Sequence, residues 1–144
     1  MRIDIKRTAL NITTYCNLRC KHCLAFIPYY DRKFVMSIEE AKKILSTYFQ
    51  VVDSVEHFTV TGGEPLLNKD CAQILEEVHK YENKITGSVD FVTNGTMEIP
   101  GNIIDVLAEH KDKTKVVLSN YGEDLSKKID VIAVSYTHLT LPTT

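Results

Sequence analysis

The sequence lacks the features that would place the protein in a membrane or on nucleic acid. Its 144 residues contain no run of about 18 apolar side chains, the length that a membrane-spanning helix needs. Residues 1–7 alternate charged and apolar side chains, so the continuous apolar stretch of a signal peptide is missing. The formal net charge of −2 provides no basic surface for nucleic acid. We therefore expect a cytoplasmic protein that binds neither membrane nor nucleic acid.

Cysteine is scarce, but three of the four cysteines crowd into one short segment. Cys16, Cys20 and Cys23, here called the cysteine triplet, have the spacing C-x3-C-x2-C. Cys71 stands alone at the start of a helical pattern, where we expect a small buried apolar residue. A pair of disulfides is a poor interpretation, because the triplet is too tightly spaced and a reducing cytosol disfavours structural disulfides.

The cysteine triplet is typical of a metal centre. Iron–sulfur clusters are held by cysteine thiolates, normally four, so three leave one iron without a protein ligand. An open metal position can bind and activate a small molecule. Zinc held by the triplet and His22 is an alternative, although His22 adjoins Cys23 and the two would have difficulty reaching one ion. A buried helical face is a further alternative, but Asn17, Arg19 and Lys21 give it little apolar support.

Strand-like and helix-like segments alternate along the chain. Their patterns predict strands over 8–14, 57–61, 88–93 and 114–119. The helices are expected over 37–50, 69–82, 102–110 and 124–128. Ser37 and Glu40 form a capping box at the start of the first helix. This order predicts an α/β fold, a parallel sheet built of right-handed βαβ units.

The most distinctive segments follow the predicted strands directly. In parallel folds the functional residues collect at the carboxyl ends of the strands, so we expect these segments to converge on one rim. They are the cysteine triplet, Gly62-Gly63-Glu64-Pro65, Thr93-Asn94-Gly95 and Ser119-Asn120.

Each of these segments also has an ordinary interpretation. Gly62-Gly63-Glu64-Pro65 allows close backbone approach and exposes carbonyls and a carboxylate suited to an ammonium group, yet it could be a simple turn. Thr93-Asn94-Gly95 could be a turn, and Ser119-Asn120 a helix cap. The histidines His57, His79 and His110 show no mutual spacing that suggests a metal site.

Taken together and in order, these motifs resemble those of the radical S-adenosylmethionine (radical SAM) enzymes. C-N-L-R-C-K-H-C follows the first strand, G-G-E-P the second and T-N-G the third, over residues 8–122. The resemblance implies a partial (β/α) barrel of the radical SAM type, of which about four of six βα units are present. It places the N-terminal part of the core domain at residues 1–130.

The resemblance also implies roles for the motif residues. The cysteine triplet would ligate three irons of a [4Fe–4S] cluster, and the fourth iron would chelate the methionine part of S-adenosylmethionine (SAM). Gly62, Gly63 and Glu64 would receive the methionine ammonium group. The remaining cofactor contacts would come from Thr93, Asn94, Ser119 or Asn120, and from His22, which stands where the family commonly has an aromatic residue near adenine.

The activity implied is reductive cleavage of SAM to a 5′-deoxyadenosyl radical that abstracts hydrogen from an unidentified substrate, a peptide or a small molecule. A flavodoxin or ferredoxin would supply the electron. An incomplete barrel would expose a strand edge and open the cofactor to water, which disfavours activity of this chain by itself. The alternative function is a non-catalytic metal-binding module with zinc on the cysteine triplet.

The last residues differ in composition from the rest. Residues 131–144 contain no charged side chain, and residues 134–139 resemble the translation of a transposon-adapter sequence. We expect residues 131–144 to be a non-native or truncated tail.

Overall fold

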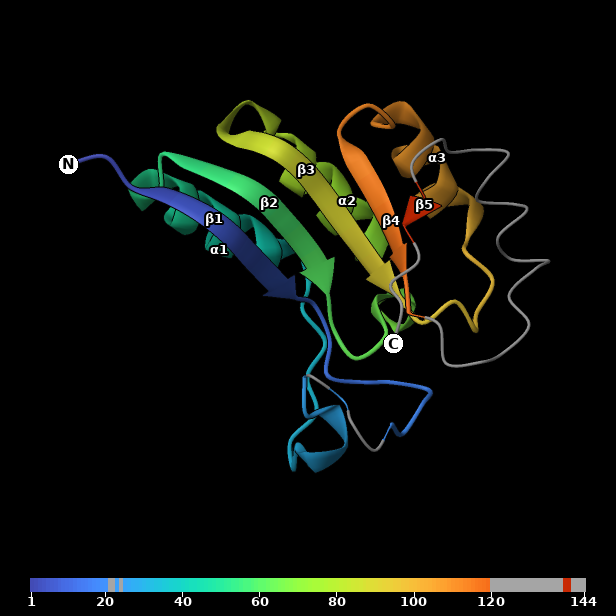
Figure 1. Ribbon diagram of the computed structural model, residues 1–144. Coiled ribbons are helices and arrows are strands. Elements are labelled where there is room, and N and C mark those ends of the chain that lie inside the picture. The colour runs from blue at the N-terminus through green and yellow to red at the C-terminus, as the bar shows by residue number, and fades with distance from the viewer. Residues whose placement is uncertain (21–22, 24, 120–138, 141–144) are drawn as a thin grey trace.

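Five parallel strands form one sheet, and they follow one another in space as they do in the sequence (Figure 1). The computed structural model describes residues 1–20, 23, 25–119 and 139–140. The strands are β1 (Asp4–Asn11), β2 (Ser54–Thr61), β3 (Ile85–Thr93), β4 (Thr114–Leu118) and β5 (Leu139–Thr140). All neighbouring strands pair in parallel, which confirms the predicted parallel sheet.

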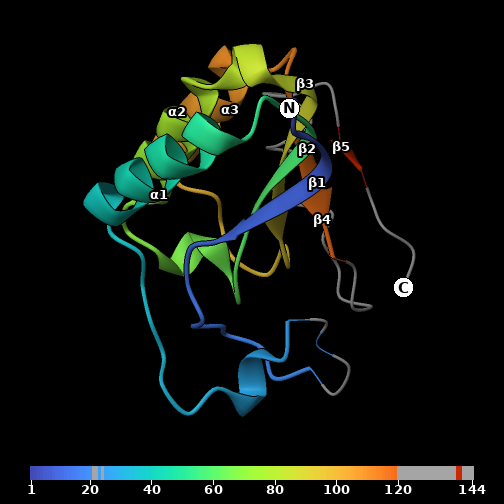
Figure 2. The same ribbon diagram turned by 90° about the vertical axis from the view of Figure 1, so that its left-hand side faces the viewer.

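The α-helices all cover the same face of the sheet (Figure 2). They are α1 (Ile38–Val51), α2 (Cys71–His79) and α3 (Gly101–Glu109), one after each of the first three strands. Short 3-10 turns are η1 (Ile27–Tyr29), η2 (Pro65–Leu67) and η3 (Glu82–Lys84). None of the helices in the described ranges is both long enough and apolar enough to cross a bilayer. The predicted helix over 124–128 lies outside the described residues.

The start of α1 confirms the predicted capping box. The Ser37 side chain accepts a hydrogen bond from the Glu40 amide at 3.2 Å, and the Glu40 carboxylate accepts one from the Ser37 amide at 2.8 Å. Leu45 and Phe49 are buried against the sheet, whereas Ile44 is 43% exposed. The Phe49 ring stacks on Phe58 of β2 and on Tyr81, which follows α2.

The core lies between the helices and the covered face of the sheet. Phe58, Phe91 and Ile74 are almost fully buried there, and Cys71 is 1% exposed, as expected for a small apolar residue. Alternate positions on the strands point to the uncovered face. This uncovered face would become the lumen if further strands closed the barrel.

The first strand begins and ends earlier than its composition predicts. The charged N-terminal residues belong to β1, because it is an edge strand whose outward side chains meet water. After Asn11 the chain leaves the sheet, and Thr13 forms an antiparallel bridge with Val35 instead. The two-residue strand β5 lies inside the segment expected to be a tail. Whether residues 131–144 are native stays a prediction.

Candidate functional site

The ends of β1 and β2 are joined by backbone hydrogen bonds. The Gly63 amide donates to the Thr13 carbonyl at 2.7 Å, and the Glu64 amide donates to the Tyr15 carbonyl at 2.8 Å. The approach is too close for side chains, because a Cβ on Gly63 would lie 2.2 Å from the Tyr15 carbonyl oxygen and 3.0 Å from the Cys16 Cβ. The glycines are therefore needed for close packing, which brings the start of the cysteine segment against the Gly62–Gly63 turn.

The Glu64 carboxylate connects this turn to the end of β3. One oxygen accepts hydrogen bonds from the Thr93 hydroxyl at 2.7 Å and from the Leu66 amide at 3.2 Å. The other oxygen accepts one from the Asn94 amide at 2.8 Å. Pro65 leaves Glu64 extended, with φ −126° and ψ 110°, as its sequence position predicts.

Glu64 corrects one expectation. Its side chain was expected to be exposed at the rim, but it is 0% exposed and both its oxygens accept hydrogen bonds from the protein. Burial raises the pKa of this carboxyl, although the three hydrogen-bond donors act in the opposite direction. The sequence around Glu64 does not reveal this burial, because two of the donors, Thr93 and Asn94, come from the end of β3. Glu64 therefore links the turn after β2 to the end of β3 through its hydrogen bonds to Thr93 and Asn94.

Asn17 extends the network to the cysteine segment. Its side-chain amide donates to the Thr96 hydroxyl at 2.8 Å, and its oxygen accepts a hydrogen bond from the Asn94 side-chain amide at 2.8 Å. Gly95 has φ 72°, a left-handed conformation that glycine adopts at little cost, and the chain bends there as it leaves β3. Asn17 is a site residue that sequence reasoning missed, and its position directly after Cys16 is the signal that could have identified it.

The end of β4 joins the same rim. The Ser119 amide donates to the Thr93 carbonyl at 3.0 Å. The four predicted segments therefore do converge, in agreement with the rule for parallel sheets. Two expected contact residues, His22 and Asn120, lie outside the described residues.

The thiols of the cysteine triplet are free and half-buried. The Cys16 sulfur accepts a hydrogen bond from the Leu18 amide at 3.4 Å. Burial raises the pKa of the Cys16 thiol, and the negative charges of Glu64, Cys20 and Cys23 raise it further. A bound cation beside the Cys16 thiol would oppose this rise, because a positive charge favours the thiolate form.

The spacing of the three sulfurs bears on the kind of metal centre. Tetrahedral zinc with bonds of about 2.3 Å to sulfur places two thiolates about 3.8 Å apart. Among the described residues, the sets of three ligand atoms within 4.8 Å of one another do not include the cysteine triplet. At least one pair of these three sulfurs therefore lies more than 4.8 Å apart, farther than one zinc ion would hold two thiolates.

Residues 10–132 match the family model of the Radical SAM superfamily. The chain belongs to this superfamily. The GTP 3′,8-cyclase of Campylobacter jejuni subsp. doylei is 32% identical over 88 residues, which cover 60% of this chain and 26% of that protein. The GTP 3′,8-cyclase of Actinobacillus succinogenes is 34% identical over 88 residues, covering 60% and 25%. The chain thus spans about a quarter of the length of these curated relatives.

Solved structures share the fold. Streptococcus suis SuiB, bound to its precursor peptide SuiA, superposes with a TM-score of 0.66 at 19% identity, over 90% of this chain and 27% of SuiB. BtrN, in complex with AdoMet and 2-DOIA, has a TM-score of 0.69 at 15% identity, over 98% of this chain and 57% of BtrN. The partial (β/α) barrel expected from the sequence is therefore confirmed as the fold.

Proposed function

We propose that the rim binds a [4Fe–4S] cluster through Cys16, Cys20 and Cys23 and binds SAM beside it, against the Gly62–Gly63 turn. The observation that carries this proposal is the packing of Gly63 onto the backbone of Tyr15 and Cys16, with a Cβ position only 3.0 Å from the Cys16 Cβ. It brings the segment that would hold the cluster into contact with the segment that would hold SAM.

The protein residues supply binding and orientation. The three thiols are unpaired, partly accessible and outside the packed core, as a cluster-binding segment requires. With three ligands, one iron would remain open to the amino and carboxylate groups of SAM. The cofactor would supply reductive cleavage of the SAM sulfonium to a 5′-deoxyadenosyl radical, which abstracts hydrogen from a substrate.

The turn after β2 offers acceptors for the methionine ammonium. No donor among the described residues bonds to the carbonyl of Gly62 or Gly63. Gly63 is partly exposed, so its carbonyl suits an ammonium group, which carries three donors, better than that of the buried Gly62. Glu64 supports this site by fixing the turn to Thr93 and Asn94, and its buried charge adds to the attraction of a cation.

The remaining assignments belong to the same proposal. Thr93 and Asn94 are buried at the rim, whereas Ser119 is partly exposed, so a direct ligand contact suits Ser119 best. Contacts from Asn120 to SAM, and from the His22 ring to adenine, stay predictions. A flavodoxin or ferredoxin as electron donor and a cytoplasmic location are proposed with them.

The substrate is proposed only as a class, a peptide or a small molecule. SuiB was solved with a precursor peptide, and BtrN with the small molecule 2-DOIA. The chain spans 26% of the Campylobacter GTP 3′,8-cyclase and 27% of SuiB, so the proposal names a class of substrate and no single compound.

Anaerobic reconstitution with iron and sulfide tests the proposal. We expect a brown protein with four irons and four sulfides per chain, as a [4Fe–4S] cluster requires. Dithionite and SAM should then yield 5′-deoxyadenosine. Cys20→Ala should lose the cluster while keeping its far-ultraviolet circular dichroism, because Cys20 lies outside the core. Wild-type iron in this variant would refute the ligand assignment, and a colourless protein holding one zinc would favour the metal-binding module.

A further inference from the structure

A second group of side chains that can bind a metal lies at the end of the sheet where the strands begin, opposite the end that carries the cysteine triplet. His79 is the last residue of α2, Glu82 begins η3 and His110 caps the end of α3. Thr114 begins β4 beside them. The helices end and the strands start on this side of the sheet, whereas the rim lies where the strands end. The sequence spacing of these histidines indicates no metal site, but the fold brings His79 and His110 together with Glu82.

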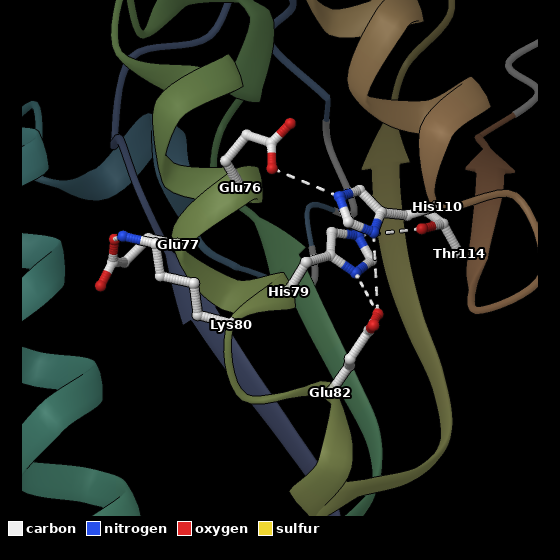
Figure 3. A network of polar contacts seen from close by, with 7 residues as sticks. All are labelled: Glu76, Glu77, His79, Lys80, Glu82, His110 and Thr114. Carbon is white, nitrogen blue, oxygen red and sulfur yellow. Dashed lines mark hydrogen bonds and ion pairs between the residues drawn. The ribbon is translucent and has the colours of Figure 1, made fainter.

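Glu82 faces both imidazole rings (Figure 3). One of its oxygens lies 3.4 Å from His79 Nδ1 and 3.7 Å from His110 Nδ1. The three ligand atoms lie within 4.8 Å of one another. Tetrahedral zinc with bonds of about 2.0–2.1 Å separates its nitrogen and oxygen ligands by about 3.3 Å. We propose that His79, Glu82 and His110 form a site for a divalent transition-metal ion, with zinc the best match to two imidazoles and a carboxylate.

The other ring nitrogens are held by protein groups. His79 Nε2 lies 3.0 Å from the Thr114 hydroxyl, and both side chains are buried. His110 Nε2 lies 3.2 Å from a Glu76 oxygen. A partner on the nitrogen that does not touch the metal usually orients a metal-binding histidine, and the Thr114 hydroxyl can do this for His79. These contacts leave both Nδ1 atoms turned toward Glu82, as Figure 3 shows.

The surroundings favour a cation. Helices α2 and α3 both end beside these side chains, at His79 and Glu109. Helix C-termini carry partial negative charge, which attracts a cation. Glu76 and Glu109 form a second carboxylate group around His110. A surface pocket is lined by Glu82, Glu109 and His110, with Asp112 and Lys113 beside them, so two of the three ligands are reached from solvent. A bound ion would tie α2, η3 and α3 together.

The stacking of the rings sets a condition on binding. The His79 and His110 rings are parallel within 3°, with centroids 3.9 Å apart. An ion binds in the plane of each ring, so one ring must turn out of the stack. The His110 side chain is the one able to move, because it is 18% exposed whereas the His79 side chain is 1% exposed.

Calorimetric titration with Zn²⁺ alone tests the site, and it does not depend on cluster chemistry. The background is the full chain with all three triplet cysteines changed to alanine, which removes the competing thiolates. We expect one zinc per chain. In that background Glu82→Gln and His110→Gln should each weaken zinc binding by at least about tenfold. Replacing Zn²⁺ with Co²⁺ should give visible bands that these variants lose.

His57→Gln is the matched control. His57 also has a carboxylate neighbour, Glu56 at 3.5 Å, and a hydroxyl neighbour, Ser88 at 3.0 Å, but no second histidine. It should bind zinc like the background protein. The Glu82 side chain is 47% exposed, so its variant should fold and carry the test even if His110→Gln does not. Absence of zinc binding in the background protein, or equal affinity in all variants, would overturn the proposal.

Discussion

Replacing Gly63 by alanine should separate the two loops that form the rim. The new Cβ would lie 2.2 Å from the Tyr15 carbonyl oxygen, where ordinary contact starts at 3.4 Å, so the atoms must part by about 1.2 Å. That shift breaks the hydrogen bonds from Gly63 to Thr13 and from Glu64 to Tyr15. Because Cys16 follows Tyr15 directly, the cysteine segment must move as well.

The cost of the Gly63→Ala change can be estimated from these contacts. Two lost backbone hydrogen bonds cost about 1 kcal/mol each, and forcing a methyl group into packed backbone costs about 1–3 kcal/mol. Restricting the unfolded chain returns about 0.4–1 kcal/mol. The free energy of unfolding should therefore fall by roughly 2–5 kcal/mol. Iron bound after reconstitution should fall too, because the first ligand is displaced.

Urea denaturation and iron analysis measure both effects, with Gly101→Ala as the matched control. Gly101 is the first residue of α3, and a Cβ there would meet nothing within 4 Å. This control should lose no iron and should gain up to about 1 kcal/mol of stability. If Gly63→Ala unfolds at the same urea concentration as Gly101→Ala and binds as much iron as the wild type, the close approach of the loops is not what holds the cysteine segment.

Further predictions concern the buried carboxylate, the isolated thiol and the first helix cap. Glu64→Gln should lower the free energy of unfolding by about 1–3 kcal/mol in urea denaturation, because one of three donors loses its acceptor; unchanged stability would mean that burying the charge costs as much as the bonds contribute. A thiol reagent should count three reactive groups in the native apoprotein and four after unfolding, since Cys71 is 1% exposed and burial raises its pKa to about 12; four fast thiols would contradict the packing of α2. Ser37→Ala should cost about 1 kcal/mol by the same denaturation assay, and no loss would show that the capping box adds nothing.

The architecture was predictable because its signals are local. The capping box at Ser37 depends on a few neighbouring residues, and it was confirmed. The convergence of the rim followed from parallel topology alone. The start of β1 was missed, because its charged edge positions do not look like a buried strand.

The details of the site depend on contacts between distant residues. Glu64 is buried by donors 29 and 30 residues away, so its exposure could not be inferred from G-G-E-P. His79 and His110 stack although a whole strand and helix lie between them, and only the register of α2 against α3 brings them together. Asn17 was visible in the sequence, but its partner Asn94 lies 77 residues away.

The central claim is that the cluster binds SAM at its open iron. Electron paramagnetic resonance spectra of the reduced, reconstituted protein, recorded with and without SAM, test it most directly. A cluster held by three thiolates has one iron free to accept SAM, so the spectrum should change when SAM is added, and Gly63→Ala should diminish the change. A reduced cluster whose spectrum is the same with and without SAM would contradict the account.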